Sequence, residues 1–423
     1  ASDVYKRQGR NDWASQIAGS PSKSFFYPSV GLSWVPSSTW DLGNAFSYLK
    51  LRGSIASVGL PFPRFLTTPT YEYDATGKIW KDKTHYPIGD LKPERTITYE
   101  VGIDARLWKN ISLSASWYSA DTKNQTFDPA LPPSSSYTTI YLQTGHVRNT
   151  GVELSLGYSN QWRDFGWSSN FTFSWNKNEI VDLASGALNP VTGQPLNLSE
   201  LDIKGLGKAK YILKQGGTLG DLYTTSDLKF NDNGYVEVDK AGNLLLTDEG
   251  EQIYLGSVFP SENLAWRNDF RYKGINLGLL FTGRIGGICY SATQANMDLY
   301  GVSEVSAAAR DAGGVLINGR EMVDAQKWYQ AIGSQSGLPQ YYTYSATNFR
   351  LQELSLGYTL PRKWFRNKMV LTVSFVGRNL WMIYCKAPFD PEAVASTGLS
   401  YQGIDYFMMP SLRSLGFNVK FEF

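Results

Sequence analysis

The chain has 423 residues, with 40 Lys and Arg against 38 Asp and Glu and a formal net charge of +2. This balance lacks the clustered basic excess that nucleic-acid binding requires, and the sequence holds no run of about 18 apolar residues that would form a transmembrane helix. Aromatic residues make up 14% of the chain and Gly contributes 40 residues, a mixture typical of β-strands joined by turns.

The first eight residues do not continue any pattern found later in the chain. They do not begin with Met and do not have the pattern of a signal peptide. We therefore expect residues 1–8 to be a non-native addition, and residues 9–423 to be part of a longer protein.

The dominant signal is alternation of apolar and polar residues with a period of two, as in a β-strand with two different faces. In the clearest run, 96–107, Tyr99 and Val101 point to one face and Glu100 points to the other. About ten residues of this kind cross a membrane when the strand is tilted. The same test predicts eleven strands, at 25–35, 47–57, 96–107, 111–121, 150–160, 167–178, 263–273, 276–287, 347–360, 369–381 and 411–423.

The connections between these strands alternate in length. The short ones lie at 36–46, 108–110, 161–166, 274–275 and 361–368, and the long ones at 58–95, 122–149, 179–262, 288–346 and 382–410. A soluble β-sandwich gives no reason to place every long loop at one end, whereas outer-membrane barrels have short periplasmic turns and long extracellular loops. The sequence therefore predicts an all-β, antiparallel transmembrane β-barrel. Carboxylates on the polar faces would line its lumen, namely Glu100, Asp104, Glu153 and Glu353.

Aromatic residues mark both the turns and the chain end. Trp34, Trp108, Trp162 and Trp364 lie at or beside the short turns, where amphipathic rings favour the membrane interface. The alternative is that these tryptophans pack in the core of a soluble fold. The last strand ends in Phe417, Val419, Phe421 and Phe423 on one face, which we interpret as the signal that the barrel-assembly machinery reads.

Other motifs are weaker. The run 231–237 offers oxygen atoms for calcium, although a plain Asn-Gly turn fits it better. A helix is expected around 323–332. His85 and His146 are interpreted as surface residues and Cys289 and Cys385 as incidental, and no catalytic constellation or metal-ligand spacing is found.

Five collinear runs carry a family resemblance. They are Asn348–Pro361, Gly377–Trp381, Phe389–Glu392, Tyr27–Trp34 and Gly145–Glu153. Together they resemble motifs of SusC-like TonB-dependent outer-membrane proteins, although 256–260 departs from the family's usual G-N-x-x-P. The resemblance implies about 22 strands in the complete barrel, of which about eleven, the C-terminal half, lie here. It also implies a plug domain outside residues 9–423.

The resemblance further implies an outer-membrane importer of glycans or oligopeptides that is not an enzyme and needs no cofactor. Its partners would be TonB, acting through the missing N-terminal region, a SusD-like surface lipoprotein, the barrel-assembly machinery and outer-membrane lipid. Loop aromatics are the candidates for solute contact: Tyr71, Tyr73, Trp80, Tyr137, Tyr141, Tyr341, Tyr342 and Tyr344. Two alternatives stay open, a passive porin or outer-membrane enzyme barrel, and a secreted β-rich adhesin or carbohydrate-binding protein.

Overall fold

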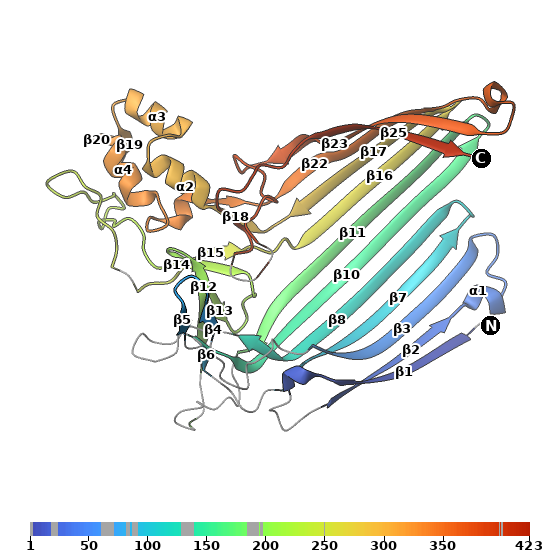
Figure 1. Ribbon diagram of the computed structural model, residues 1–423, viewed down its shortest axis with the longest axis horizontal. Coiled ribbons are helices and arrows are strands. Elements are labelled where there is room, and N and C mark those ends of the chain that lie inside the picture. The colour runs from blue at the N-terminus through green and yellow to red at the C-terminus, as the bar shows by residue number, and fades with distance from the viewer. Residues whose placement is uncertain are drawn as a thin grey trace.

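The main element of the fold is one antiparallel sheet of 12 strands, which we call the wall. The structure is a computed structural model that describes residues 3–17, 24–60, 72–81, 85–86, 92–127, 139–183, 194, 198–248, 250–396, 398 and 401–423. Figure 1 shows the long strands side by side in a curved wall that has β1 at one edge and β25 at the other. In spatial order the strands are β1 (Asp3–Trp13), β2 (Ser24–Trp34), β3 (Phe46–Leu60), β7 (Glu94–Leu107), β8 (Ile111–Phe127), β10 (Leu142–Trp162), β11 (Phe165–Asp182), β16 (Glu262–Tyr272), β17 (Ile275–Ile285), β22 (Asn348–Thr359), β23 (Val370–Cys385) and β25 (Ser414–Glu422).

All eleven predicted strands are present, and β1 is a twelfth that alternation did not reveal. It pairs with β2 along its whole length, from Asp3 opposite Trp34 to Trp13 opposite Ser24. The register sets Arg7 opposite the apolar Val30, so β1 does not share the polarity of the other strands. The expectation that residues 1–8 are non-native stays a prediction.

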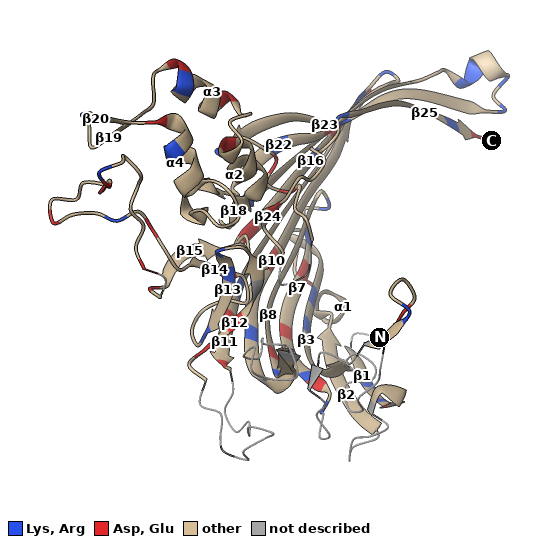
Figure 2. Ribbon diagram, turned by 60° about the vertical axis from the view of Figure 1, so that its left-hand side comes forward, with Lys and Arg blue, Asp and Glu red and all other residues tan. Residues whose placement is uncertain are grey.

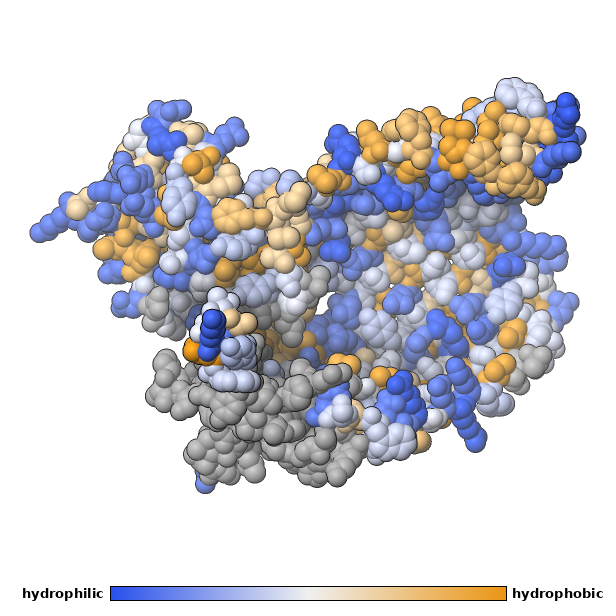
Figure 3. Space-filling model, viewed as in Figure 1, coloured by the Kyte–Doolittle hydropathy of each residue, from blue (hydrophilic) through white to orange (hydrophobic). Residues whose placement is uncertain are grey.

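The pairing register gives the wall two chemically different faces. Glu153 on β10 lies opposite Ser116 on β8 and Ser174 on β11, whereas the next residue, Leu154, lies opposite Ala115 and Phe173. Because side chains alternate along a strand, this register collects polar residues on one side, the polar face, and apolar residues on the other, the apolar face. Figure 3 shows hydrophobic residues gathered over β23 and β25 at the upper right.

Short turns join neighbouring strands at one end of the wall. The two residues between β16 and β17, Lys273 and Gly274, both have positive φ, at 46° and 91°. A two-residue turn with two positive φ angles matches the twist of an antiparallel pair, and Gly adopts this conformation without a Cβ clash. Two longer connections at this end hold α1 (Pro36–Thr39) and η3 (Arg362–Phe365).

The long connections meet at the other end of the wall. We call segments 199–261, 286–347 and 386–413 the cap. It contains β12 (Glu200–Leu206), β13 (Ala209–Lys214), β14 (Asp221–Thr224), β15 (Ile253–Ser257), β18 (Ile288–Ser291), α2 (Ala292–Leu299), α3 (Glu304–Asp311), β19 (Val315–Ile317), β20 (Glu321–Val323), α4 (Ala325–Ile332), η2 (Pro339–Tyr342), β21 (Thr343–Ser345) and β24 (Ile404–Asp405). Figure 1 shows these elements grouped beside the ends of β16, β17 and β22.

Each of the helices α2, α3 and α4 begins after a side chain that accepts a hydrogen bond from a backbone N–H group of the first turn. Ser291, Ser303 and Asp324 accept a hydrogen bond from the third residue beyond them, the usual N-terminal cap. Helix α4 confirms the helix predicted around 323–332, whereas α2 and α3 were not predicted. None of the helices in the described ranges is long and apolar enough to cross a membrane.

The main hydrophobic core lies in the cap and continues into the adjoining strand ends. Tyr290, Leu338 and Ile404 in the cap are fully buried, and Val147 and Ile180 at the ends of β10 and β11 join the same cluster. The remaining small elements lie in other connections: η1 (Ser15–Ile17), β4 (Glu72–Asp74), β5 (Ile79–Lys81), β6 (His85–Tyr86) and β9 (Thr139–Ile140).

Candidate functional site: the polar face and the cap

A group of charged side chains lies on the polar face of β3 and β7, beside a hydroxyl group of β8. The Arg52 guanidinium donates to Glu100, and its Nε lies 3.7 Å from Asp104 Oδ2. Asp104 also lies 3.9 Å from Lys50 Nζ and accepts a 2.7 Å hydrogen bond from Ser114 Oγ. Two cations therefore balance two carboxylates on neighbouring strands. Figure 2 shows acidic and basic residues close together around β7 and β10.

A second charged group lies on β16, β22 and β23. Arg267 Nε is 2.9 Å from Asp269 Oδ2 and its Nη1 is 3.3 Å from Glu353 Oε1, while Arg378 Nε reaches the other Glu353 oxygen at 3.0 Å. The prediction that Glu353 lies on the polar side of its strand is confirmed, as it is for Glu100, Asp104 and Glu153.

The motif strand β10 and its neighbour β11 together place a band of amide side chains on the polar face. Asn149, Gly151 and Glu153 alternate along β10 and share that face. A Cβ on Gly151 would lie 2.5 Å from the Tyr118 ring, so this Gly leaves room for the tyrosine. Tyr118 then donates a 3.0 Å hydrogen bond to Asn176 Oδ1, and Asn149 Oδ1 accepts from Asn178 Nδ2 at 2.9 Å.

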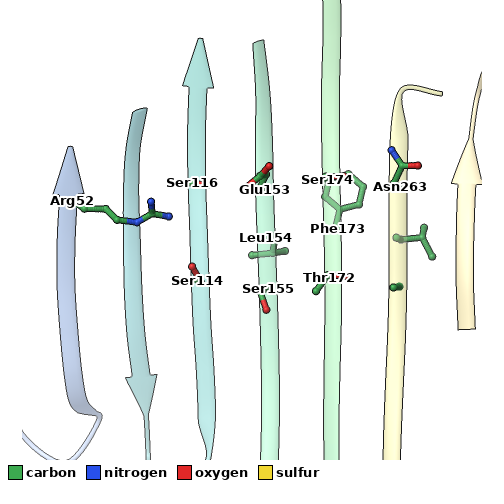
Figure 4. A pocket seen from close by; sticks show the side chains of 12 residues that line it. Arg52, Ser114, Ser116, Glu153, Leu154, Ser155, Thr172, Phe173, Ser174 and Asn263 are labelled. Atoms are coloured by element: carbon green, nitrogen blue, oxygen red, sulfur yellow. The ribbon is translucent and has the colours of Figure 1, made fainter. Parts of the chain in front are cut away.

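A shallow pocket of about 370 Å³ surrounds Glu153. Figure 4 shows side chains from neighbouring strands around it. Glu153 is exposed on this face, and it has no ion pair with another residue that the structure describes. The lining residues are Arg52 and Glu153 together with hydroxyl, amide and apolar residues of both faces: Ser114, Ser116, Leu154, Ser155, Thr172, Phe173, Ser174, Asn263, Leu264 and Ala265.

The cap is bonded directly to the wall above this band. Leu219 N donates to Asn178 Oδ1 at 2.9 Å, and Ile180 N donates to Gly217 O at 2.8 Å. The first cap segment is therefore hydrogen-bonded to the same asparagine that Asn149 contacts.

The predicted solute-contact residues fall into different environments. Tyr73 and Trp80 form an exposed pair on the β4–β5 hairpin, 50% and 69% exposed, with ring centroids 5.1 Å apart. Tyr341 is exposed beside Trp328, at a centroid distance of 6.2 Å.

The other candidates are less accessible or lie outside the described residues. Tyr342 is 3% exposed within the cap core, so in this conformation its ring cannot touch a solute. Tyr141 is half-buried, and Tyr344 packs edge-on against Phe389 at 5.7 Å. Tyr71 and Tyr137 lie outside the described residues.

The tryptophans predicted at the membrane interface all lie at the short-turn end. Trp34 ends β2, Trp108 lies in the β7–β8 turn, Trp162 ends β10 and Trp364 lies in η3. Trp162 stacks on Phe165 across its turn, at 5.9 Å. This placement is the one that an aromatic girdle requires, and the interface role stays a prediction. The same holds for the insertion signal, whose members are exposed: Phe417, Val419, Phe421 and Phe423.

One sequence interpretation is wrong, and the turn favoured for the run 231–237 is confirmed. His146 was taken for a surface loop residue, but it lies on β10 with its Nε2 2.8 Å from Asp121 Oδ1, since β10 extends eight residues beyond its predicted start. The run 231–237 is a turn in which Asn231 Oδ1 accepts from the backbone of Asn233 and Tyr235, so the oxygen that calcium would need already has two donors.

Sequence reasoning missed the pairing of two motifs. Arg350, from the run 348–361, and Asp390, from the run 389–392, form a buried ion pair with an N–O distance of 2.8 Å. The signal that could have found it is chemical. An Arg and a carboxylate both placed next to the cap are expected to pair when buried.

Comparison with known protein families identifies the family to which this fold belongs. The family model described as TonB dependent receptor-like, beta-barrel matches residues 3–259. The chain belongs to this TonB-dependent receptor family. The SusC-like resemblance is confirmed, and so is the outer-membrane β-barrel that it implies.

Relatives of the TonB-dependent receptor family align along most of the chain. TonB-dependent receptor P3 of Formosa agariphila is 24% identical over 99% of this chain and 44% of its own length. TonB-dependent receptor SusC of Bacteroides thetaiotaomicron is 20% identical over 79% of this chain and 32% of its own. The RagAB peptide importer in its closed-closed state has the same fold, with a TM-score of 0.73 and 20% identity over 99% of this chain and 45% of that one. The chain thus spans less than half the length of these relatives.

Proposed function

We propose that the chain forms the lumen wall and extracellular cap of an outer-membrane importer that takes up glycans or oligopeptides. The observation that carries this proposal is the position of the cap. It is bonded to the upper end of a hydrogen-bonding lumen face, through Leu219 and Asn178, so a solute entering from outside meets the cap first and then the amide band. A polar solute needs such donors and acceptors along its path.

The exposed Tyr73 and Trp80 pair supports a solute larger than a simple ion. Two tilted rings offer an apolar surface with polar edges, which suits a sugar ring or a peptide side chain. RagAB is described as a peptide importer, which supports oligopeptides for this chain. The sequence alone favoured neither class.

We further infer the partners that the importer needs. TonB would supply energy through a region outside residues 9–423, and a SusD-like lipoprotein would bind on the cap side. The family membership supports both partners. The barrel-assembly machinery would recognise β25, and lipid would cover the apolar face.

The test is uptake by the full-length protein in an outer membrane, with and without TonB. Labelled oligopeptides and oligosaccharides are supplied to cells that express the protein or the double variant Tyr73→Ala, Trp80→Ala. We expect uptake of one class, its loss without TonB and a reduced rate in the double variant. Uptake that persists without TonB, with steady ion conductance, would assign a passive porin. Chemical conversion of the solute would assign an enzyme barrel.

A further inference from the structure

The last of the three cap segments, residues 386–413, joins the wall to the other two cap segments, and we call it the strap; residues 397, 399 and 400 in it lie outside the described residues. It leaves the wall at the end of β23 and returns at the start of β25. Between these points, β24 lies parallel to β18 in the cap, with Tyr290 opposite Ile404 and Ser291 opposite Asp405. The strap therefore has one attachment on the wall and another in the cap.

The wall attachment is a bidentate ion pair. Arg350 lies on the polar face of β22, opposite Thr282, and donates from Nη1 to Asp390 Oδ2 at 3.0 Å and from Nη2 to Oδ1 at 2.8 Å. The two side chains are 4% and 9% exposed. Asn348 Oδ1 accepts from Arg350 Nε at 3.2 Å, which fixes the guanidinium plane. Two parallel bonds of this kind fix geometry as well as adding energy.

The surrounding groups complete the charge balance. Glu392 Oε1 lies 3.1 Å from Arg350 Nη2 and 3.6 Å from Arg284 Nε on β17. Two guanidinium groups therefore face two carboxylates. Breaking one such buried pair leaves an uncompensated charge, which is strongly unfavourable.

Asp390 also organises the strap itself. Its Oδ1 accepts from the backbone N–H of Glu392 at 3.0 Å, and the Ser411 hydroxyl donates to its Oδ2. Burial alone would raise the pKa of Asp390, but hydrogen bonds from Arg350 and Ser411 outweigh it and hold the pKa below its usual range. One carboxylate thus joins the wall, the beginning of the strap and the segment that leads into β25.

The cap attachment uses backbone and hydroxyl groups. Tyr290 N donates to Gly403 O at 2.9 Å, Ser291 Oγ donates to Asp405 Oδ2 at 2.7 Å, and Phe407 N donates to Thr293 Oγ1 at 2.6 Å. The Tyr211 hydroxyl donates to Gln402 O. Ile404 is fully buried in the cap core, so this end of the strap cannot move without the cap.

We propose that the strap holds the cap against the wall and that the pair between Arg350 and Asp390 is its anchor. When the pair is intact, the strap stays fixed to β22 and, through β24, to β18 and α2. When the ion pair between Arg350 and Asp390 is broken, the strap is no longer held to β22. The other cap segments then open locally more often, while the strands of the wall stay paired. The pair is therefore a positioning device for whatever the cap admits, and it does not depend on the identity of the solute.

Hydrogen exchange of the full-length protein in detergent micelles tests this proposal. The variant is Asp390→Asn, which keeps the shape of the side chain and removes its charge. We expect amides in β18, α2 and β24 to exchange at least about tenfold faster, because local opening sets their rate, while amides of β10 and β11 keep theirs. The matched control is Glu353→Gln, which breaks a wall ion pair on the same strand β22 without touching the strap.

Three results would overturn the proposal. The first is unchanged cap exchange in Asp390→Asn. The second is an equal rise in Glu353→Gln, which would indicate general loosening of the wall. The third is that neither Asp390→Asn nor Ser411→Ala gives a heat-modifiable barrel. The pair between Arg350 and Asp390 would then be needed for assembly of the wall itself. Ser411→Ala removes one hydrogen bond and keeps the charges, so a smaller rise in cap exchange is expected for it.

Discussion

Leu156 and Ser155 are neighbours on β10 that face opposite environments, and exchanging each for Arg tests the assignment of the two faces. Leu156 lies between Leu113 and Phe171 on the apolar face and is 44% exposed. Ser155 lies between Ser114 and Thr172 on the polar face. We predict that Leu156→Arg strongly destabilises the barrel in lipid and that Ser155→Arg does not.

The size of the effect follows from depth in the membrane. Leu156 is six residues from Trp162, where β10 ends at a short turn. At about 3.4 Å per residue and a strand tilt of about 40°, it lies about 15 Å above that turn along the membrane normal. The apolar band of such barrels is about 25 Å tall, so Leu156 is near the midplane, where Arg costs about 2–4 kcal/mol. That is roughly 30- to 900-fold in the folding equilibrium, whereas a change on the water-facing side is usually within about 0.5 kcal/mol.

The assay is folding of the full-length protein into lipid vesicles, followed by the urea midpoint and by the heat-modifiable band on gels. Leu156→Ala is the control for lost side-chain packing, and the difference between it and Leu156→Arg is the cost of the charge. If Ser155→Arg were as damaging as Leu156→Arg, or more so, the faces would be assigned wrongly and the polar face would not line the lumen.

Three further predictions concern the chain end, the loops and the cap. Phe423→Ser should lower the amount of heat-modifiable protein in the outer membrane several-fold, because the terminal aromatic would no longer be read, whereas Lys420→Ser on the other face of β25 should not. Trp80→Ala should weaken solute binding in calorimetry if the ring packs on the solute, and unchanged affinity would exclude it as a contact. Tyr290→Phe removes a fully buried hydroxyl that has no hydrogen-bond partner among the described residues. It should therefore leave cap exchange unchanged or slow it, since an unpaired buried hydroxyl costs about 1–3 kcal/mol, and faster exchange would reveal a partner.

The wall strands could be predicted because lipid and water impose a period of two on the residues between them. Where that constraint ends, the prediction ends too. Strand β8 was predicted to stop at 121 and β10 to start at 150, yet the two stay paired up to Phe127 and Leu142. Beyond the apolar band both faces meet water, so the alternation fades while backbone hydrogen bonding continues. Strand β1 was missed for a related reason, since Arg7 occupies a position on its apolar face.

The cap could be predicted only in part because its order comes from contacts between distant segments. Helix α4 was found since Trp328, Tyr329 and Ile332 recur at helical spacing and the last two pack into the core. Half of the residues of helix α3 are Ser or Ala, and its single buried side chain is Ser306. Its position depends on neighbours that no local pattern identifies, as β24 depends on β18 more than a hundred residues earlier.

Three of the family motifs contain residues that contact one another or a neighbouring strand in the structure, and neither the composition of the motifs nor their order in the chain predicted these contacts. In the run 145–153, Gly151 lacks a side chain and so leaves space for the Tyr118 ring, and Asn149 accepts a hydrogen bond from Asn178. The runs at 348–361 and 389–392 are complementary, since Arg350 of the first binds Asp390 of the second. Arg350 lies on the polar face of β22 beside the cap, and a buried charge of this kind needs a partner of opposite charge. The second motif supplies that partner. Matching such residues by charge across motifs therefore yields a tertiary contact that strand periodicity alone does not give.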